Sequence, residues 1–153
     1  MRKTTTALAA LGVAILGITV PVGTAQAATA CDNAWHALPA GMMGAYEHAD
    51  CGGGFLGRTA GADSNWRNDL GAFQGADNDK ASSVLNAGTT DSDYTVVQFF
   101  NDAGTTGGYS CLKRGEFYAS NLTNDYFTSG HVVNDNISSH RWVREQDCGR
   151  FMT

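Results

Sequence analysis

The chain has 153 residues, of which 42% are hydrophobic and 16% charged, with 19 Gly and 2 Pro. This length and hydrophobic share fit a folded protein of one domain or two small ones, and the lack of a glycine triplet repeat excludes collagen. With 10 Lys and Arg against 15 Asp and Glu, the net charge of −5 argues against binding to duplex nucleic acid or to an anionic membrane, and leaves enzymes, inhibitors and binding modules open.

Residues 1–27 have the pattern of a secretory signal peptide, which predicts a secreted, extracellular protein. Two basic residues precede an apolar run over 7–20, and a small-residue cleavage site follows at 25–27. The run is shorter than the ~20 residues of a transmembrane helix, so we expect no membrane attachment after cleavage. A second small-residue triplet precedes Cys31, but it lacks the aliphatic residue of a lipoprotein signal, so lipidation of Cys31 is the less favoured alternative.

After residue 27, helical periodicity is nearly absent, and short β-rich segments alternate with turns rich in Gly, Asn and Asp. This alternation predicts an all-β sandwich. Strands are expected over 43–48, 55–59, 82–85, 94–100, 109–113 and 137–144. We predict an N-terminal extension over 28–42, a domain over 43–145 and a C-terminal tail over 146–153.

The four cysteines are even in number, and export would place them where disulfides persist. Three pairings are possible from sequence alone. We favour Cys31 with Cys51 and Cys111 with Cys148, because each bridge would then tie one end of the chain to its nearer half. A zinc site is the weaker alternative, since the chain has no C-x-x-C pair and its spacings match no ligand set.

The most informative feature is an internal repeat. The motif Asn-Asp-x-x-Ser-Ser occupies 78–83 and returns 56 positions later at 134–139. The segment 46–48, an aromatic residue followed by polar ones, has a counterpart at 100–102, at an offset of 54. A glycine-rich stretch follows each of these segments, so the chain after residue 27 consists of two copies of one β unit.

The repeated motif carries side-chain oxygens, which are the ligands that hard cations such as Ca²⁺ prefer. One motif supplies too few ligands, but two motifs brought together by a pseudo-twofold axis could complete two sites. The alternative is that Asn, Asp and Ser only make local side-chain to backbone hydrogen bonds that shape a turn. The repetition favours the cation sites.

The paired motifs, each preceded by an aromatic-polar pair and a glycine-rich loop, resemble those of microbial βγ-crystallin domains. The resemblance extends over about 43–142. It implies a disulfide-stabilised, two-Greek-key sandwich, with repeats at about 43–86 and 94–143, that binds up to two Ca²⁺ ions between its repeats. The hairpin over 46–55 is longer than the usual spacing of the family, and Cys111 stands where the first repeat has Gly57.

The same resemblance implies a set of ligands in matched pairs, one member from each repeat. They are Asp79 and Asp135 through their side chains, Ser82 and Ser138 through their hydroxyls, Lys80 and Asn136 through their backbone carbonyls, and Glu47 and Asn101 through a hairpin carbonyl, with Asn78 and Asn134 bracing the loops. Ser82 would serve one ion and Asp79 the other, so that each site would draw on both repeats.

Export, two disulfides and a crystallin-like fold are together also similar to the secreted actinobacterial metalloproteinase-inhibitor family. This second resemblance implies an extracellular protease as the partner, bound by an exposed rigid loop of a monomeric protein. Segments 61–68 and 102–109 are the candidate loops.

No motif of an enzyme stands out: the histidines form no H-E-x-x-H, and the glycine runs lack the Gly-Lys-Ser/Thr of a phosphate loop. We therefore expect a protein without catalytic activity. A third possibility is a carbohydrate-binding or toxin-like module at the cell surface. It depends on Trp66, which lies among polar residues and is expected to be exposed, whereas Trp142 is expected in the core.

Overall fold

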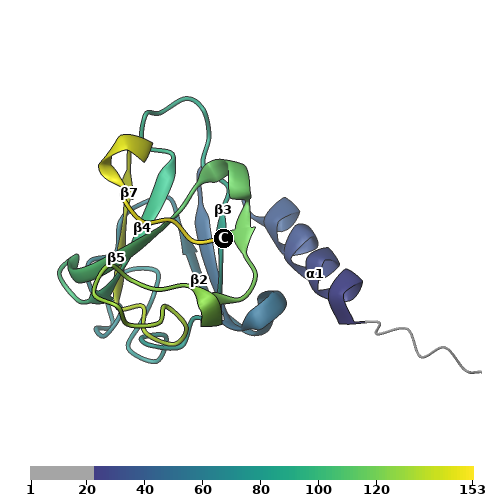
Figure 1. Cartoon of the computed structure of the whole chain (residues 1–153), viewed down its shortest axis with the longest axis horizontal. Helices are drawn as coiled ribbons and strands as arrows, with labels where there is room; N and C mark the ends of the chain where they lie inside the picture. The colour runs from purple at the N-terminus through teal and green to yellow at the C-terminus, as the bar shows by residue number, and fades with distance from the viewer. Residues whose placement is uncertain (1–22) are drawn as a thin grey trace, which may run out of the picture.

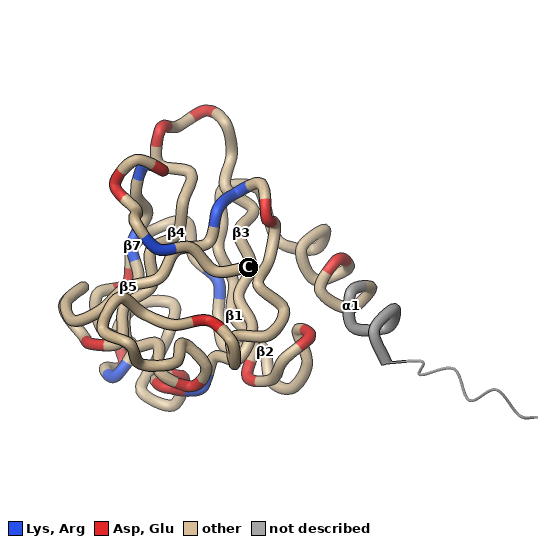
Figure 2. The backbone as a smooth tube through the Cα atoms, in the orientation of Figure 1, with Lys and Arg blue, Asp and Glu red and all other residues tan. Residues whose placement is uncertain are grey.

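The computed structural model describes residues 23–153, so most of the predicted signal peptide lies outside the described residues. It contains two antiparallel sheets with one helix at the N-terminal side (Figure 1). Within the described residues, no helix is long and apolar enough to cross a membrane. Acidic residues are spread over the loops around the sandwich (Figure 2).

Helix α1, Gly23–Ala37, was not expected from the sequence. Its residues include six alanines, the best helix former, but they show no clear apolar stripe. Contacts with the sandwich hold its end in place: the Trp35 indole donates a hydrogen bond to the carbonyl of Asn86 at 2.9 Å, and the Trp35 ring lies 4.7 Å from that of Phe117. The helix therefore covers the last residues of the predicted signal peptide and most of the segment predicted as an extension, and contacts with the sandwich hold its C-terminal end.

The sandwich has seven strands in two sheets. The first sheet has the order β2 (Gly52–Thr59), β1 (Met43–His48), β3 (Ser83–Asn86) and β6 (Tyr118–Ala119). The second has the order β5 (Thr106–Leu112), β4 (Val96–Asp102) and β7 (Ser139–Val143). Short 3₁₀ turns lie at Ala49–Cys51, Arg114–Glu116, Leu122–Asn124 and Glu145–Asp147.

The two repeats exchange a strand. In each repeat an antiparallel hairpin, β1–β2 or β4–β5, is followed by a strand that pairs with the first strand of that hairpin, β3 or β7. The segment between them crosses to the other sheet: Asp63 bridges to His140 on β7, and β6 pairs with β3. This is the topology of two interlocked Greek keys of the βγ-crystallin type, which confirms the predicted fold class.

All six predicted strands are present, with ends that differ by a few residues. The prediction missed β6, which has two residues and exists because the open edge of β3 supplies its hydrogen-bonding partner. The last residues of the chain also add to the sheet, because the amide of Cys111 donates to Arg150 and that of Met152 donates back to Cys111.

The predicted cysteine pairs, Cys31–Cys51 and Cys111–Cys148, are both formed. The first uses the sulfur of Cys31 that a lipid would occupy, so the lipoprotein alternative is wrong. Zinc is also excluded as a thiolate-bound metal, because no cysteine in the described chain is free. Two disulfides fit a protein of an oxidising compartment.

The core lies between the sheets, and it overturns one prediction about the tryptophans. Trp66 is fully buried, its ring stacked on Phe73 at a centroid distance of 3.9 Å. It is therefore a core residue and not an exposed platform for a sugar, which removes the basis of the carbohydrate-binding possibility. Trp142 is half-buried and packs against the same core.

Candidate metal centre

The two copies of the motif adopt the same local structure. Asp79 and Asp135 both have left-handed backbones, with φ of 56° and 55°. Asp and Asn visit this region more readily than other residues because their short side chains can form local hydrogen bonds. Here the Nδ2 of Asn78 donates to Asp79 at 2.6 Å, and the Nδ2 of Asn134 donates to Asp135 at 2.8 Å. Each loop thus holds its carboxylate in a fixed position.

The two loops then bind each other across the repeats. The amide of Asp79 donates to the carbonyl of Ile137 at 3.1 Å, and the amide of Asp135 donates to that of Ala81 at 3.0 Å. Because these bonds are reciprocal, each aspartate is attached to the fourth residue of the opposite motif.

This attachment brings each carboxylate to the hydroxyl of the other motif. Ser138 Oγ donates to Asp79 Oδ1 at 3.0 Å, and Ser82 Oγ donates to Asp135 Oδ1 at 2.9 Å. We name these pairs the Asp79–Ser138 clamp and the Asp135–Ser82 clamp. Asp79 and Ser82, which both belong to the first repeat, therefore lie in different clamps, each with a partner from the second repeat.

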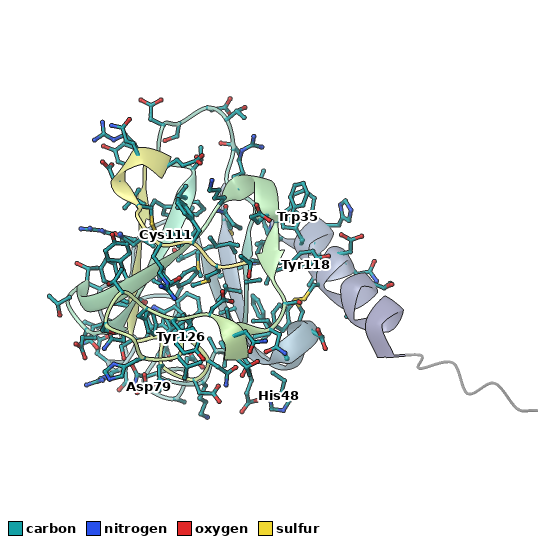
Figure 3. All side chains as sticks on the ribbon, viewed as in Figure 1. Trp35, His48, Asp79, Cys111, Tyr118 and Tyr126 are labelled. Carbon is teal, nitrogen blue, oxygen red and sulfur yellow. A yellow bond between two sulfur atoms is a disulfide. The ribbon has the colours of Figure 1, made fainter. Side chains whose placement is uncertain are left out.

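Each hairpin is joined to a clamp by an equivalent backbone hydrogen bond. The amide of Ser82 donates to the carbonyl of Tyr46 at 3.0 Å, and that of Ser138 donates to Phe100 at 2.9 Å. Glu47, the neighbour of Tyr46, lines one pocket with the residues of the Asp135–Ser82 clamp. Asp79 and His48 lie at the same end of the sandwich, away from Trp35 (Figure 3).

The remaining predicted ligands are Lys80, Asn136 and Asn101, each beside a clamp or next in sequence to a residue bonded to one. Lys80 lines the pocket of the Asp135–Ser82 clamp and is exposed. The side-chain Nδ2 of Asn136 donates to the carbonyl of Asn134 at 2.8 Å, and Asn101 Oδ1 accepts from the backbone amide of Gly108 at 2.6 Å. The ligands implied for Lys80, Asn136 and Asn101 are their backbone carbonyls. The two side-chain bonds do not involve these carbonyls.

Sequence reasoning missed the role of the last serine of each motif. Ser83 Oγ donates to the carbonyl of His48 at 2.8 Å and accepts from the amide of Cys51 at 3.1 Å. Ser139 Oγ makes the equivalent bonds with Asp102 at 2.6 Å and Thr105 at 3.2 Å. Each serine fastens its hairpin to the clamp. The repetition of Ser at the sixth position was the available signal.

Each motif also leaves one buried oxygen without a donor. Asn78 Oδ1 and Asn134 Oδ1 are buried and have no hydrogen-bond partner in the described structure. A buried carbonyl oxygen without a donor is unfavourable unless a proton donor, water or cation meets it. The donor set of the two clamps, which is carboxylate, hydroxyl and amide oxygen, fits a hard cation.

The two clamps contain few carboxylates. Among residues 29–153, no three His, Cys, Asp or Glu side chains are grouped so that they could hold a metal ion. Each clamp has one carboxylate, so a cation there would depend on neutral oxygens and on water. This arrangement suits Ca²⁺, which accepts carbonyl, hydroxyl and water oxygens, better than Zn²⁺, which requires nitrogen or sulfur ligands.

A buried histidine, His140, lies two residues after Ser138. Burial lowers the pKa of His140 to about 4, against the smaller opposing effects of a hydrogen bond to Gly61 and the charge of Asp63. The Trp66 indole donates to His140 Nδ1 at 2.9 Å. Because an indole nitrogen can only donate, His140 is neutral with its proton on Nε2, which lies 3.2 Å from the carbonyl of Gly61.

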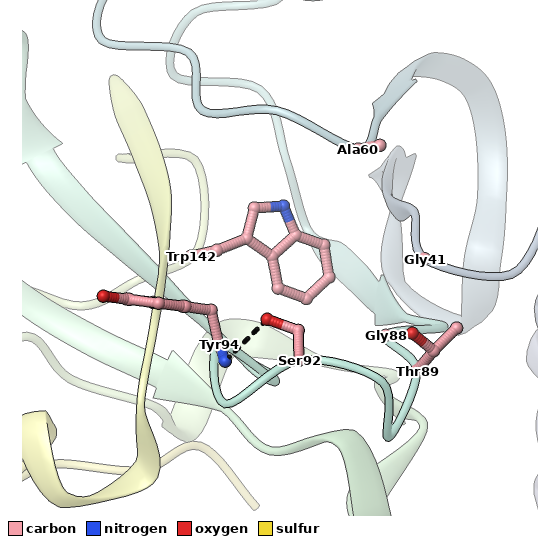
Figure 4. Close-up of a pocket in the computed structure, with 7 residues that line it drawn as sticks. All are labelled: Gly41, Ala60, Gly88, Thr89, Ser92, Tyr94 and Trp142. Atoms are coloured by element: carbon pink, nitrogen blue, oxygen red, sulfur yellow. Dashed lines mark hydrogen bonds between the residues drawn. The ribbon is translucent and has the colours of Figure 1, made fainter.

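A separate pocket lies away from the clamps. It is lined by seven residues, none of them charged: Gly41, Ala60, Gly88, Thr89, Ser92, Tyr94 and Trp142 (Figure 4). The Trp142 Nε1 is buried without a partner in the described structure. This pocket offers no ligand set for a cation.

Comparisons with known proteins find similarity to solved structures at low sequence identity. No family model and no curated protein matches the chain. The chain is similar to the solved structure of a beta gamma crystallin from Ciona intestinalis, with 20% identity over 67% of this chain and 100% of that one, at a TM-score of 0.47. A structure described as "Evolution of the eye lens beta-gamma-crystallin domain fold" is 25% identical over 69% of this chain and 89% of its own, at 0.49. A betagamma-crystallin from an archaeon is 23% identical over 69% of this chain and 100% of its own, at 0.45. The fold assignment depends on the strand order and the exchanged strands of the chain itself.

Proposed function

We propose that the chain is a secreted, non-catalytic calcium-binding domain in which Ca²⁺ ties the two Greek keys together. One observation carries the proposal: the carboxylate of each motif meets the hydroxyl of the other, at 3.0 Å and 2.9 Å. Side chains that only shaped their own turn would bond within one motif, and these contacts join the two motifs.

The residues that would hold the ions are those of the clamps, with one carboxylate and one hydroxyl each. The oxygens of Asn78 and Asn134 are further candidates, because they are buried without a donor. Since Ca²⁺ takes 6–8 oxygens, water would complete each shell. Affinity rises with the number of ligand charges, so we expect dissociation constants toward the weak end of the known range, about 10⁻⁴ M.

Calcium would act on stability through linkage. A ligand that binds only the folded state stabilises it by RT ln(1 + [Ca]/Kd), which is about 2.7 kcal/mol at a hundredfold excess over Kd. Because each clamp joins residues of both repeats, bound calcium would stabilise the contact between the two Greek keys.

Isothermal titration of Ca²⁺ into the chelator-stripped protein tests the proposal, with a thermal melt of each end point. We expect heat of binding, up to two ions per chain and a raised melting temperature. The double variant Asp79→Asn with Asp135→Asn should lose both effects, because it removes the two clamp carboxylates. Asp91→Asn, on an exposed loop, is the matched control and should retain them. No binding up to millimolar calcium would reduce the motifs to structural turns.

A second candidate function is inhibition of an extracellular peptidase, and the exposure of Leu70 favours it. Of the loops considered from sequence, 61–68 carries Trp66, whose side chain is buried in the core. Leu70, just beyond it, is 72% exposed. Its amide is held by Asn68 Oδ1 at 2.9 Å, so a large apolar side chain projects from a fixed turn.

Inhibition of a thermolysin-like protease would test this second function. Leu70→Ala should abolish stoichiometric inhibition, whereas Phe55→Ala, which removes another exposed apolar side chain at 49% exposure, should not. Asp79→Asn should inhibit as the unaltered protein does. No inhibition by the unaltered protein would exclude this function.

A further inference from the structure

The two clamps are nearly identical except for one charge. Their carboxylate-to-hydroxyl distances differ by only 0.1 Å, from 3.0 Å for Asp79–Ser138 to 2.9 Å for Asp135–Ser82. The Asp79–Ser138 clamp has an additional donor: Arg67 Nη2 lies 3.4 Å from Ser138 Oγ. Among the described residues, no Lys or Arg makes a hydrogen bond to Ser82 or Asp135.

The position of Arg67 is fixed by the core. Its neighbour Trp66 is fully buried, and the Trp66 amide donates to the carbonyl of Ser138 at 2.9 Å. The amide of Arg67 donates to Asn65 Oδ1 at 3.0 Å. The backbone of this loop therefore lies beside the second motif. From there the side chain of Arg67 brings its guanidinium to Ser138. The corresponding segment of the second repeat, which includes Leu122, has no arginine beside Ser82.

The charges around the other clamp are mostly negative. Its pocket is lined by Glu47 and Asp135, and also by Asp79 of the other clamp, with Lys80 as the one permanently cationic side chain among its lining residues. Lys80 is exposed, and no hydrogen bond or ion pair joins it to the clamp oxygens. A cation there would have Glu47 in the same pocket and no guanidinium at the clamp hydroxyl.

We propose that the two clamps are unequal cation sites: Ca²⁺ fills the Asp135–Ser82 clamp first, and the guanidinium of Arg67 is the resident cation of the Asp79–Ser138 clamp. This inference rests on the proposed calcium function.

The physical reason is competition for one oxygen. A serine hydroxyl that donates to Asp79 keeps two lone pairs, and Arg67 is directed at one of them. A guanidinium stays charged at any ordinary pH, so Ca²⁺ on Ser138 would lie beside a positive charge or displace it. Even in a medium as polar as water, a dication and a monocation about 5 Å apart repel enough to weaken binding about tenfold. Arg67 is exposed, so salt would reduce the difference.

The test is calcium titration of the full protein, stripped by chelator, at low and at high salt. We expect two binding steps whose affinities differ tenfold or more. Asp135→Asn should remove the tighter step, and Asp79→Asn only the weaker. Arg67→Gln should strengthen the weaker step about tenfold and leave the tighter one unchanged. Arg58→Gln, which removes one exposed positive charge from β2, is the matched control and should change neither step.

Arg67→Lys is the second variant, since it keeps the charge near Ser138 and should keep the weaker step weak. Melts of each variant without calcium check that the loop still folds. Two equal steps that Arg67→Gln leaves unchanged would overturn the inference while the calcium function stands. Loss of the tighter step in Asp79→Asn would also overturn it. If neither the unaltered protein nor Arg67→Gln binds calcium, the proposed function itself fails.

Discussion

The hydrogen bond between Trp66 and His140 provides a sharp test of how the core is built. Trp66→Phe keeps a ring to stack on Phe73 but removes the indole donor, which leaves His140 Nδ1 buried without a partner. An unpaired buried acceptor costs about 1–3 kcal/mol. The lost part of the ring leaves a small cavity in addition. We expect Trp66→Phe to lower the free energy of unfolding by about 3 kcal/mol.

Trp142→Phe is the matched control, because it makes the same chemical change at an indole whose Nε1 has no partner. There the variant removes an unsatisfied donor from a half-buried site, so we expect a loss of about 1 kcal/mol or less. Urea unfolding at pH 7, followed by circular dichroism, measures both. Equal losses in the two variants would refute the reasoning that the Trp66–His140 bond stabilises the core.

The pH dependence of stability separates the hydrogen bond from the cavity. The folded-state pKa of His140, about 4, lies below its ordinary value of 6.5, so His140 contributes stability that is present above pH 6.5 and is lost as the pH falls toward 4. The loss at pH 4 is about 3 kcal/mol. In Trp66→Phe the neutral imidazole loses its donor, so the pKa of His140 should rise and the acid loss should shrink. An unchanged acid profile in Trp66→Phe would contradict the assigned tautomer.

Two further predictions concern the hairpins and the disulfides. Ser83→Ala and Ser139→Ala should each lower stability by about 1–3 kcal/mol in urea unfolding, because each serine is fully buried and its loss leaves a backbone amide and a carbonyl of the hairpin unpaired; a loss below 0.5 kcal/mol would show that water replaces the hydroxyl. Replacing Cys111 and Cys148 together by Ala opens a loop of 37 residues and should cost about 3–4 kcal/mol, measured as a lower melting temperature in buffer without reductant.

The sequence by itself determined the strands, the repeat and the fold class. The short β-rich segments and the turns rich in Gly, Asn and Asp between them are local properties, and the two copies of Asn-Asp-x-x-Ser-Ser are visible without a structure. The cysteine pairing also followed, because each bridge joins an end of the chain to its nearer half. The Asp and Ser residues of the clamps could be named as candidate ligands from the sequence, because the motif that contains them is short and occurs twice.

Tertiary structure alone decided which residues meet across the sandwich. Trp66 stands among polar residues and was expected at the surface, yet the strand exchange places it between the sheets against Phe73 and His140. Helix α1 and strand β6 depend on contacts with distant elements and not on their own periodicity. Arg67 belongs to no motif, and only the crossing of its loop to the second sheet brings its charge to Ser138. Burial and long-range pairing are properties of the whole chain, so no local pattern records them.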